Sequence, residues 1–290
     1  YVRINGKVYE LLKGAYGLNV APKLFVLHLK KVLLSKGWNE LHPGIYQRIT
    51  EKIVEIAVVY VDDIAVFTHD IKGFLNEMKE IKLDNPVEVT EGQSIRYIGL
   101  DLKRTTKGIT LSLESYKRSV KVDPQRGRLC ENSINCDPKS STDTTLLNEI
   151  QQVLGTLGYI AQSDFRVCYL HSILSSRGTI HPCPKILKGC KQALQYALKL
   201  PFELTVAHSE TKAYKLCLWT DASYKVKHKQ CHVAGLAYLV PIEMDEISEV
   251  NLIMHFSKRI KRLVNSTFEA ELLAVKVLLQ RVLKRIPSLL

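Results

Sequence analysis

The chain has 290 residues, 46% of them hydrophobic and 24% charged, and its 41 Lys and Arg outnumber its 29 Asp and Glu. This composition is sufficient for packed cores, so it excludes a disordered chain, a collagen and a coiled coil. The length predicts about two or three domains, the net charge of +12 favours a polyanionic partner, and no apolar run approaches the length of a membrane span.

The first part of the chain is expected to alternate helices and strands. A helix is predicted over 21–36, because Pro22 fits a first helical turn and Gly37 is a stop signal. Its apolar face is expected to consist of Leu24, Leu27, Val32 and Leu33.

Strand pairs follow this helix. Two runs rich in Val and Ile, 53–60 and 64–68, predict a β-hairpin. A short helix is predicted over 73–81, and a second strand pair over 96–103 and 108–113.

The composition changes after residue 122. Residues 123–148 contain Pro, Gly and a Ser/Thr/Asp cluster and are predicted to be a linker. Helices are predicted over 147–162, 168–176 and 185–199, then strands over 215–219, 233–240 and 251–256, and a last helix over 268–285. One side of the last helix is expected to be apolar through Leu272, Val275, Leu278, Leu279 and Val282. The polar stretch 228–232 is interpreted as a loop rather than a zinc site.

The adjacent carboxylates Asp62 and Asp63 are the sharpest functional signal. In a regular strand, neighbouring side chains point to opposite faces, so one of two adjacent Asp in an apolar run would be buried at a cost of several kcal/mol. A tight turn avoids this cost and presents carboxylate to one cleft. Such a pair suits Mg²⁺, a hard cation that can stabilise the attacking and leaving oxygens of phosphoryl transfer. The alternative is an acidic turn without chemistry, since Asp is a common turn residue.

A second set of acids lies in the last part of the chain, with Asp221 at the end of a predicted strand and Glu269 and Glu271 in the last helix. An acid on a strand that faces an acid in the first turn of a packed helix can share a divalent ion. The two glutamates are about 200° apart around a helix, so they cannot both face the strand. Glu271 is preferred because it shares a face with apolar residues. Glu269 is expected to favour the helix N-terminus, with Ser266 or Thr267 as the cap.

Four segments are LKGAYGLNVAPK (12–23), PGIY (43–46), YVDD (60–63) and YIGL (97–100). In order and spacing they resemble the reverse transcriptases of copia-type LTR retrotransposons (Pseudoviridae). The resemblance implies a palm domain with Asp62 and Asp63 as catalytic, metal-binding residues. It also implies that Tyr60 lies near the primer end and that Tyr97 and Gly99 belong to a hairpin that grips the primer strand.

The stretch 219–272 resembles the RNase H domain of the same polyproteins, and 153–161 resembles their connection segment. In that family Asp221 and Glu271 would be catalytic acids that hold Mg²⁺, with Mn²⁺ as an alternative, against the RNA strand of an RNA–DNA hybrid. The expected fold is α+β, with a palm-type hairpin sheet and helices followed by a truncated RNase H-like α/β domain. The implied domains are a palm and thumb portion, a linker, a helical connection and an incomplete RNase H-like domain, at 1–122, 123–148, 149–205 and 206–290.

The resemblance implies a fragment of a retrotransposon RNA-directed DNA polymerase with RNase H activity. The expected partners are an RNA template, a DNA primer, an RNA–DNA hybrid, dNTPs and the rest of the Pol polyprotein, without a membrane, in cytoplasmic virus-like particles or in the nucleus. The family's first palm carboxylate precedes the Tyr16-Gly17 segment and its later RNase H acids follow the last helix, so we expect this chain alone not to be a competent polymerase. Asn19 and Val20 also replace the usual Lys-Gln, and Phe25 the usual Trp.

Two alternatives stay open. One is a catalytically dead remnant that still binds nucleic acid, which composition does not separate from an enzyme. The other is an assembly role without nucleic acid, which predicts no steep loss of nucleic-acid binding with salt.

Overall fold

A computed structural model describes the chain over residues 2–10, 19–50, 53–81, 83–125, 127, 144–178, 182–207, 213–225, 230–242 and 250–285. Its helices and antiparallel sheets agree with the expected α+β class. Two compact units divide the chain after Glu88, the first over Tyr1–Glu88 and the second over Val89–Ile286. Within the described residues, no helix combines the length and the apolar character that a membrane span requires.

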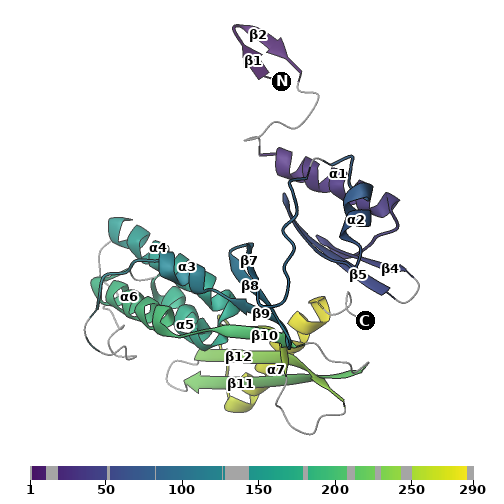
Figure 1. Cartoon of the computed structure of the whole chain (residues 1–290). Coiled ribbons are helices and arrows are strands. Elements are labelled where there is room, and N and C mark those ends of the chain that lie inside the picture. The colour runs from purple at the N-terminus through teal and green to yellow at the C-terminus, as the bar shows by residue number, and fades with distance from the viewer. Residues whose placement is uncertain are drawn as a thin grey trace. The chain divides into compact units, whose positions relative to one another are not determined.

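In the first unit, two helices pack on one face of a four-stranded antiparallel sheet (Figure 1). The sheet order is β3-β4-β5-β6, with strands Asn39–His42, Ile45–Thr50, Ile53–Tyr60 and Asp63–Phe67. The helices are α1 (Ala21–Ser35) and α2 (Ile71–Glu77). A separate hairpin is formed by β1 (Val2–Ile4) and β2 (Lys7–Tyr9).

The core of the first unit lies between these helices and the sheet. Its largest fully buried side chains are Leu29, Leu33, Trp38, Tyr46 and Met78. The helix predicted over 21–36 is confirmed, but Leu24 and Leu27 are 50% and 52% exposed, so the expected apolar face is wrong in its first half. The buried face instead uses Leu29 with Val32 and Leu33, which lie on one side at 3.6 residues per turn.

The second unit begins with another antiparallel sheet. Its order is β10-β9-β8-β7, with strands Glu203–Ala207, Gly108–Ser112, Leu100–Thr105 and Ser94–Tyr97. The expected single strand over 96–103 is wrong, because Ile98 and Gly99 form a turn between β7 and β8. Strand β10 is not among the predicted strands, and it pairs with β9 across a long stretch of sequence.

A helical layer packs beside this sheet. It consists of α3 (Glu114–Ser119), α4 (Thr144–Ser163), α5 (Cys168–Gly178) and α6 (Pro184–Lys199). The three helices predicted here are confirmed, and α4 begins within the segment expected to be a linker. Their shared core includes Leu113, Ile150, Leu157, Leu174 and Ile186.

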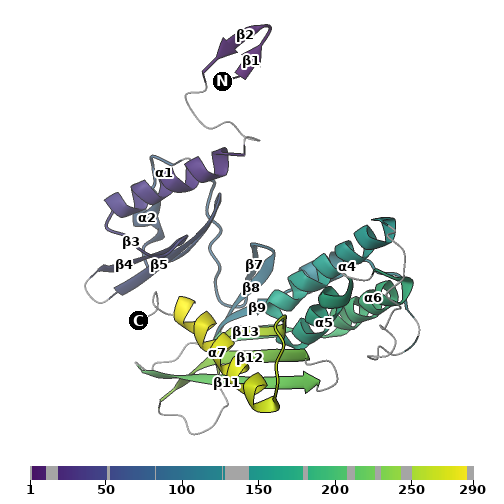
Figure 2. The ribbon, with the colours of Figure 1, turned by 180° about the vertical axis from the view of Figure 1, so that it is seen from behind.

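The last sheet lies between α5 and α7 (Thr267–Arg285) (Figure 2). Its order is β11-β12-β13, with strands Tyr214–Lys225, Gln230–Pro241 and Asn251–Ile260. Helix α7 buries Ala270, Leu273, Ala274, Leu278 and Val282. Three residues expected on this face are therefore misplaced, since Leu272, Val275 and Leu279 are 53%, 43% and 41% exposed.

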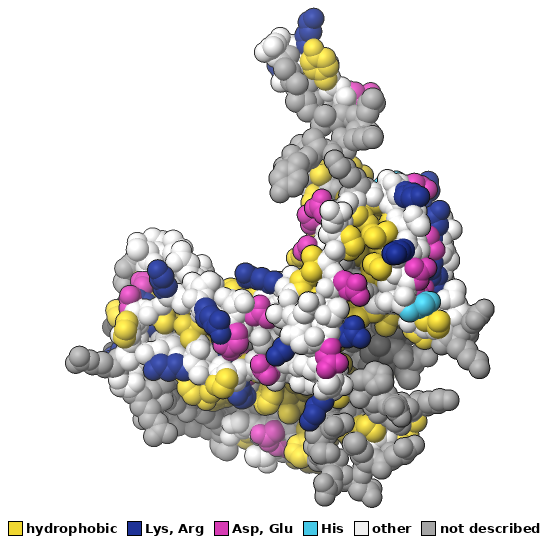
Figure 3. Space-filling model, viewed as in Figure 1, with side chains coloured by type: hydrophobic (Ala, Val, Ile, Leu, Met, Phe, Trp, Pro, Cys, Tyr) yellow, Lys and Arg dark blue, Asp and Glu magenta, His cyan; other side chains and the backbone are white. Residues whose placement is uncertain are grey.

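The two sheets of the second unit are joined at one edge. The Ala207 N–H donates to Asn251 Oδ1 at 2.7 Å, and Asn251 Nδ2 donates to the Ala207 carbonyl at 3.4 Å, so the Asn251 amide acts as a short continuation of β10. The compact units thus divide at Glu88, whereas the sequence suggested boundaries at 122 and 205. Lys and Arg side chains are interspersed with Asp and Glu over the face shown in Figure 3.

Candidate functional site

Asp62 and Asp63 lie at the turn between β5 and β6, as the sequence predicts. Tyr60 pairs with Asp63, so Val61 and Asp62 form a two-residue hairpin turn. Both aspartates are exposed, and the cost of burying a charge in this apolar run is avoided.

The faces of the β5–β6 hairpin follow from strand alternation. Ala57 and Val59 on β5 are buried against α1 and α2, so Tyr60 points to the opposite face. Its cross-strand partner Asp63 shares that face, because paired residues lie on the same side of a sheet. Tyr60 is 58% exposed, so an aromatic ring and a carboxylate stand together on the face that α1 and α2 leave uncovered.

Val61 has a backbone φ of 55°, in the left-handed region that favours glycine. For a β-branched residue this conformation is an outlier, and it costs on the order of 1–3 kcal/mol. Such strain persists only where the surrounding structure holds it, and it is concentrated at functional sites. The turn that carries the two carboxylates therefore has the backbone signature of a site as well as its side chains.

Tyr97 and Gly99 belong to a second hairpin of the same kind. Tyr97 pairs with Leu100, and the turn residues Ile98 and Gly99 have φ values of 50° and 79°. Positive φ at both positions is typical of a type I′ turn, in which Asn-Gly is the usual pair. Ile98 is thus another β-branched residue in the left-handed region. The hairpin that the resemblance placed at 97–100 is present, while periodicity alone missed it.

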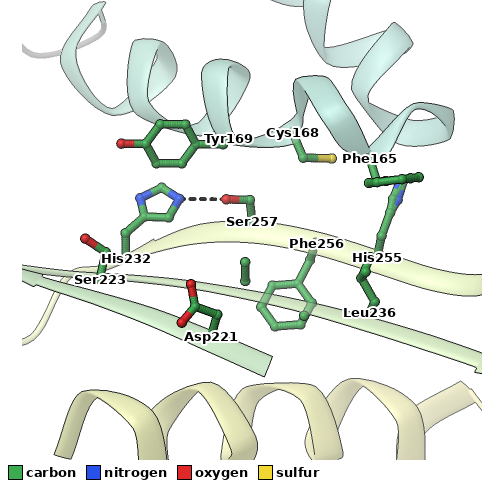
Figure 4. Close-up of a pocket in the computed structure, with 12 residues that line it drawn as sticks. Phe165, Cys168, Tyr169, Asp221, Ser223, His232, Leu236, His255, Phe256 and Ser257 are labelled. Atoms are coloured by element: carbon green, nitrogen blue, oxygen red, sulfur yellow. Dashed lines mark hydrogen bonds between the residues drawn. The ribbon is translucent and has the colours of Figure 1, made fainter. Parts of the chain in front are cut away.

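Asp221 lies in the middle of β11, an edge strand of the described sheet. Leu218, Ala222 and Tyr224 on this strand pack against the core beneath α7. Asp221 alternates with them and lines a cavity of about 260 Å³ on the other face, together with Cys168 of α5 (Figure 4).

The acids of α7 lie on the opposite side of that sheet. Glu271 is exposed, and with Glu269 it adds to the effect of burial in raising the pKa of the Cys231 thiol, which belongs to the core beneath α7. Asp221 and Glu271 are therefore not brought onto one face of the sheet. The structure separates the two carboxylates that were expected to share an ion.

Glu269 has a structural role at the start of α7. Its backbone N–H donates to Ser266 Oγ at 3.0 Å, and its carboxylate accepts from the Asn265 N–H at 2.9 Å. The same carboxylate accepts from Arg262 Nη2 at 3.1 Å. This pattern is close to a capping box, so the expectation that Glu269 favours the helix N-terminus with Ser266 as cap is confirmed.

The cavity beside Asp221 contains residues that the sequence analysis missed. His232 Nε2 and Ser257 Oγ are 2.7 Å apart, and the Tyr169 ring lies edge-on to His232 at 5.0 Å (Figure 4). Burial lowers the pKa of His232, and the positive charge of Arg259 lowers it further. His232 stands on β12 rather than in the expected polar loop, and only the strand pairing reveals that it faces this cavity.

A metal centre is not assembled by the described residues. Across these ranges, no group of three His, Cys, Asp or Glu side chains is placed to hold an ion. Asp62 with Asp63 offers two exposed carboxylates on one turn, which is a partial ligand set for Mg²⁺ beside phosphate oxygens.

Comparisons with known proteins agree with the geometry of the hairpins. Residues 3–129 match the family described as reverse transcriptase (RNA-dependent DNA polymerase). The chain is 27% identical over 243 residues to a putative transposon Ty5-1 protein of Saccharomyces cerevisiae, covering 79% of this chain and 76% of that protein. It is 25% identical over 276 residues to a retrovirus-related Pol polyprotein from transposon RE1 of Arabidopsis thaliana, covering 91% of this chain and 18% of the polyprotein.

Proposed function

Since this chain belongs to the reverse transcriptases of retrotransposon Pol proteins, we propose that it takes part in RNA-templated DNA synthesis at the Asp62–Asp63 turn. The carrying observation is that the two carboxylates are exposed at a strained hairpin turn. The proposed partners are an RNA template, a DNA primer, a dNTP and the remainder of a Pol polyprotein.

Asp62 and Asp63 would hold Mg²⁺ or Mn²⁺ in this proposal. The bound ion would supply positive charge for the attacking and leaving oxygens during nucleotidyl transfer. The carboxylates fit such an ion because they are neighbouring hard oxygen ligands that are open to solvent and to substrate phosphates. Tyr60 offers its exposed ring beside Asp63 as a contact for the primer end.

RNA-strand cleavage by residues 206–290 is a second, weaker proposal. The order of three antiparallel strands followed by a helix supports it, with Asp221 on the first strand. The opposite faces of Asp221 and Glu271 do not support a shared ion. A cleavage assay on an RNA–DNA hybrid with Asp221→Asn and Glu271→Gln separates the cases, because a two-acid site requires both losses.

The test of the first proposal is primer extension by a Pol polypeptide that carries this chain. Asp62→Asn and Asp63→Asn should each lower DNA synthesis by roughly a thousandfold, since several kcal/mol of charge stabilisation are lost. Binding of a primer–template duplex should change little. Asp84→Asn, at an exposed aspartate outside the turn, is the matched control and should retain synthesis.

Normal synthesis by either turn variant would contradict the metal-binding assignment. Duplex binding without synthesis in the unsubstituted polypeptide would instead favour the catalytically dead, nucleic-acid-binding alternative.

A further inference from the structure

The turn of the β7–β8 hairpin rests on helix α4 through one side chain. The Tyr159 hydroxyl donates a hydrogen bond to the Ile98 carbonyl oxygen at 3.3 Å. A Cβ atom added to Gly99 would lie 2.1 Å from that same hydroxyl oxygen, closer than real Cβ contacts. The tyrosine and the glycine are therefore fitted to each other.

Neighbouring contacts hold both sides of this junction. The Tyr159 ring lies 4.4 Å from the Tyr116 ring of α3, measured between centroids. The Ser115 N–H, at the start of α3, donates to Asp101 Oδ2 on β8 at 2.8 Å. Tyr159, Tyr116 and Leu100 all pack against the core of the helical layer. The hairpin is thus anchored to the helices at its turn and at β8.

The turn requires such support because of its backbone. Ile98 has a φ of 50°, and a β-branched residue in this region is strained. A hydrogen bond to the Ile98 carbonyl favours one orientation of the peptide unit that follows it. Without that bond, the turn is free to relax toward less strained conformations.

We propose that Tyr159 is a positioning residue, which sets the place of the Ile98–Gly99 turn relative to a bound primer strand. This inference rests on the proposed function, in which the hairpin contacts the primer. Tyr159 acts through the turn and does not touch nucleic acid. The helical layer then contributes to polymerase geometry through a single hydroxyl.

The experiment uses this chain and a recessed DNA primer on an RNA template, with 5-iodouracil at single primer positions near the 3′ end. Irradiation followed by mass spectrometry should show a crosslink to the peptide 94–105 in the unsubstituted chain. In Tyr159→Phe, the yield of this crosslink should fall about 3- to 10-fold, as expected from loss of one neutral hydrogen bond. Overall duplex affinity and the melting temperature should stay close to those of the unsubstituted chain.

Tyr169→Phe is the matched control, because this tyrosine is 49% exposed on α5 and contacts His232 rather than the hairpin. It should leave the crosslink unchanged. A crosslink of full yield in Tyr159→Phe overturns the positioning role and leaves the proposed function intact. Absence of any crosslink to 94–105 in the unsubstituted chain contradicts the primer contact itself, and with it both proposals.

A second pair of variants tests the fit directly. Gly99→Ala brings its Cβ against the Tyr159 hydroxyl, and it should reduce the crosslink more in the unsubstituted background than in Tyr159→Phe. Strain from the positive φ of residue 99 is common to both backgrounds and cancels in the comparison. Equal effects in the two backgrounds would show that the hydroxyl does not set the turn.

Discussion

Glu55 lies in the middle of strand β5 with only 2% of its side chain exposed. Burial alone would raise its pKa, but hydrogen bonds from Thr68 and Arg48 and the nearby charges of Arg48 and His69 outweigh burial and lower it. Arg48 Nε is 2.7 Å from Glu55, and Arg48 also pairs with Glu77 at 2.7 Å. This network ties the sheet of the first unit to its helix α2.

We predict that this network makes the first unit sensitive to acid. A carboxyl whose pKa is lowered by folding stabilises the native state above its unfolded pKa, and that stability is lost as the pH falls through the folded value. Glu55→Gln should lower the unfolding free energy by about 1–3 kcal/mol at pH 7 and flatten its decline below about pH 4.5. Urea unfolding at several pH values measures this. Glu77→Gln, at the more exposed partner, should have the smaller effect, and equal effects would contradict the dominant role of Glu55.

Single residues also show why the two acidic sites differed in predictability. Asp62 and Asp63 interrupt an apolar run, and burial of a charge is costly enough that a turn is nearly the sole solution. Around Asp221, both alternating sets contain apolar and polar residues, so neither face of the strand is preferred. A shift by one residue exchanges the faces of a strand, and only tertiary packing selects between them.

Helix α7 carries apolar residues on two faces, and the sequence does not show which face is buried. Leu278 is 1% exposed against the sheet, whereas the adjacent Leu279 is 41% exposed. Both positions fit an apolar stripe, but they are about 100° apart around the helix. Contacts with β11 and β12 decide the choice, and these strands lie far from α7 in sequence.

These neighbouring leucines provide a matched pair for a stability test. Leu278→Ala should lower the unfolding free energy of the second unit by about 2–5 kcal/mol, because it leaves a cavity in the core. Leu279→Ala should cost less than about 1 kcal/mol. Denaturant unfolding of both variants checks the difference. Similar losses would mean that Leu279 is covered in solution.

The hairpins teach a related lesson for strands. The segment 96–103 is β-favourable throughout, and Ile98 conceals the turn because β-branched residues rarely adopt positive φ. The family resemblance located this hairpin, whereas propensity did not. Strand β10 was missed for another reason, since its partner β9 lies almost a hundred residues earlier and no local signal marks the pairing.

At the scale of the whole molecule, the thumb-like sheet and the last sheet are parts of one compact unit. The pairing of β9 with β10 and the Asn251–Ala207 hydrogen bonds connect them. The sequence suggested boundaries from composition, which reports linkers but not long-range pairing. The hairpin at 97–100 and the face that carries Asp221 are consequently fixed to one scaffold.

The net charge of +12 leads to the last prediction, which concerns binding to nucleic acid. Lys and Arg that neutralise phosphates release counterions, so the affinity for an RNA–DNA hybrid should fall steeply with salt. For six to ten phosphate contacts, the loss is about 10³- to 10⁵-fold between 50 and 200 mM salt. Fluorescence anisotropy across this range gives the slope. A flat salt response would favour an assembly role without nucleic acid.

The basic stretch at the end of β13 allows this slope to be dissected. Lys258 and Lys261 are exposed, so Lys258→Gln and Lys261→Gln should each reduce the slope by about one if they contact phosphates. Lys72→Gln, at an exposed lysine of α2, has the same change in net charge. If all three substitutions reduce the slope equally, attraction arises from overall charge. If only the β13 variants do, this end of the last sheet borders the path of the duplex.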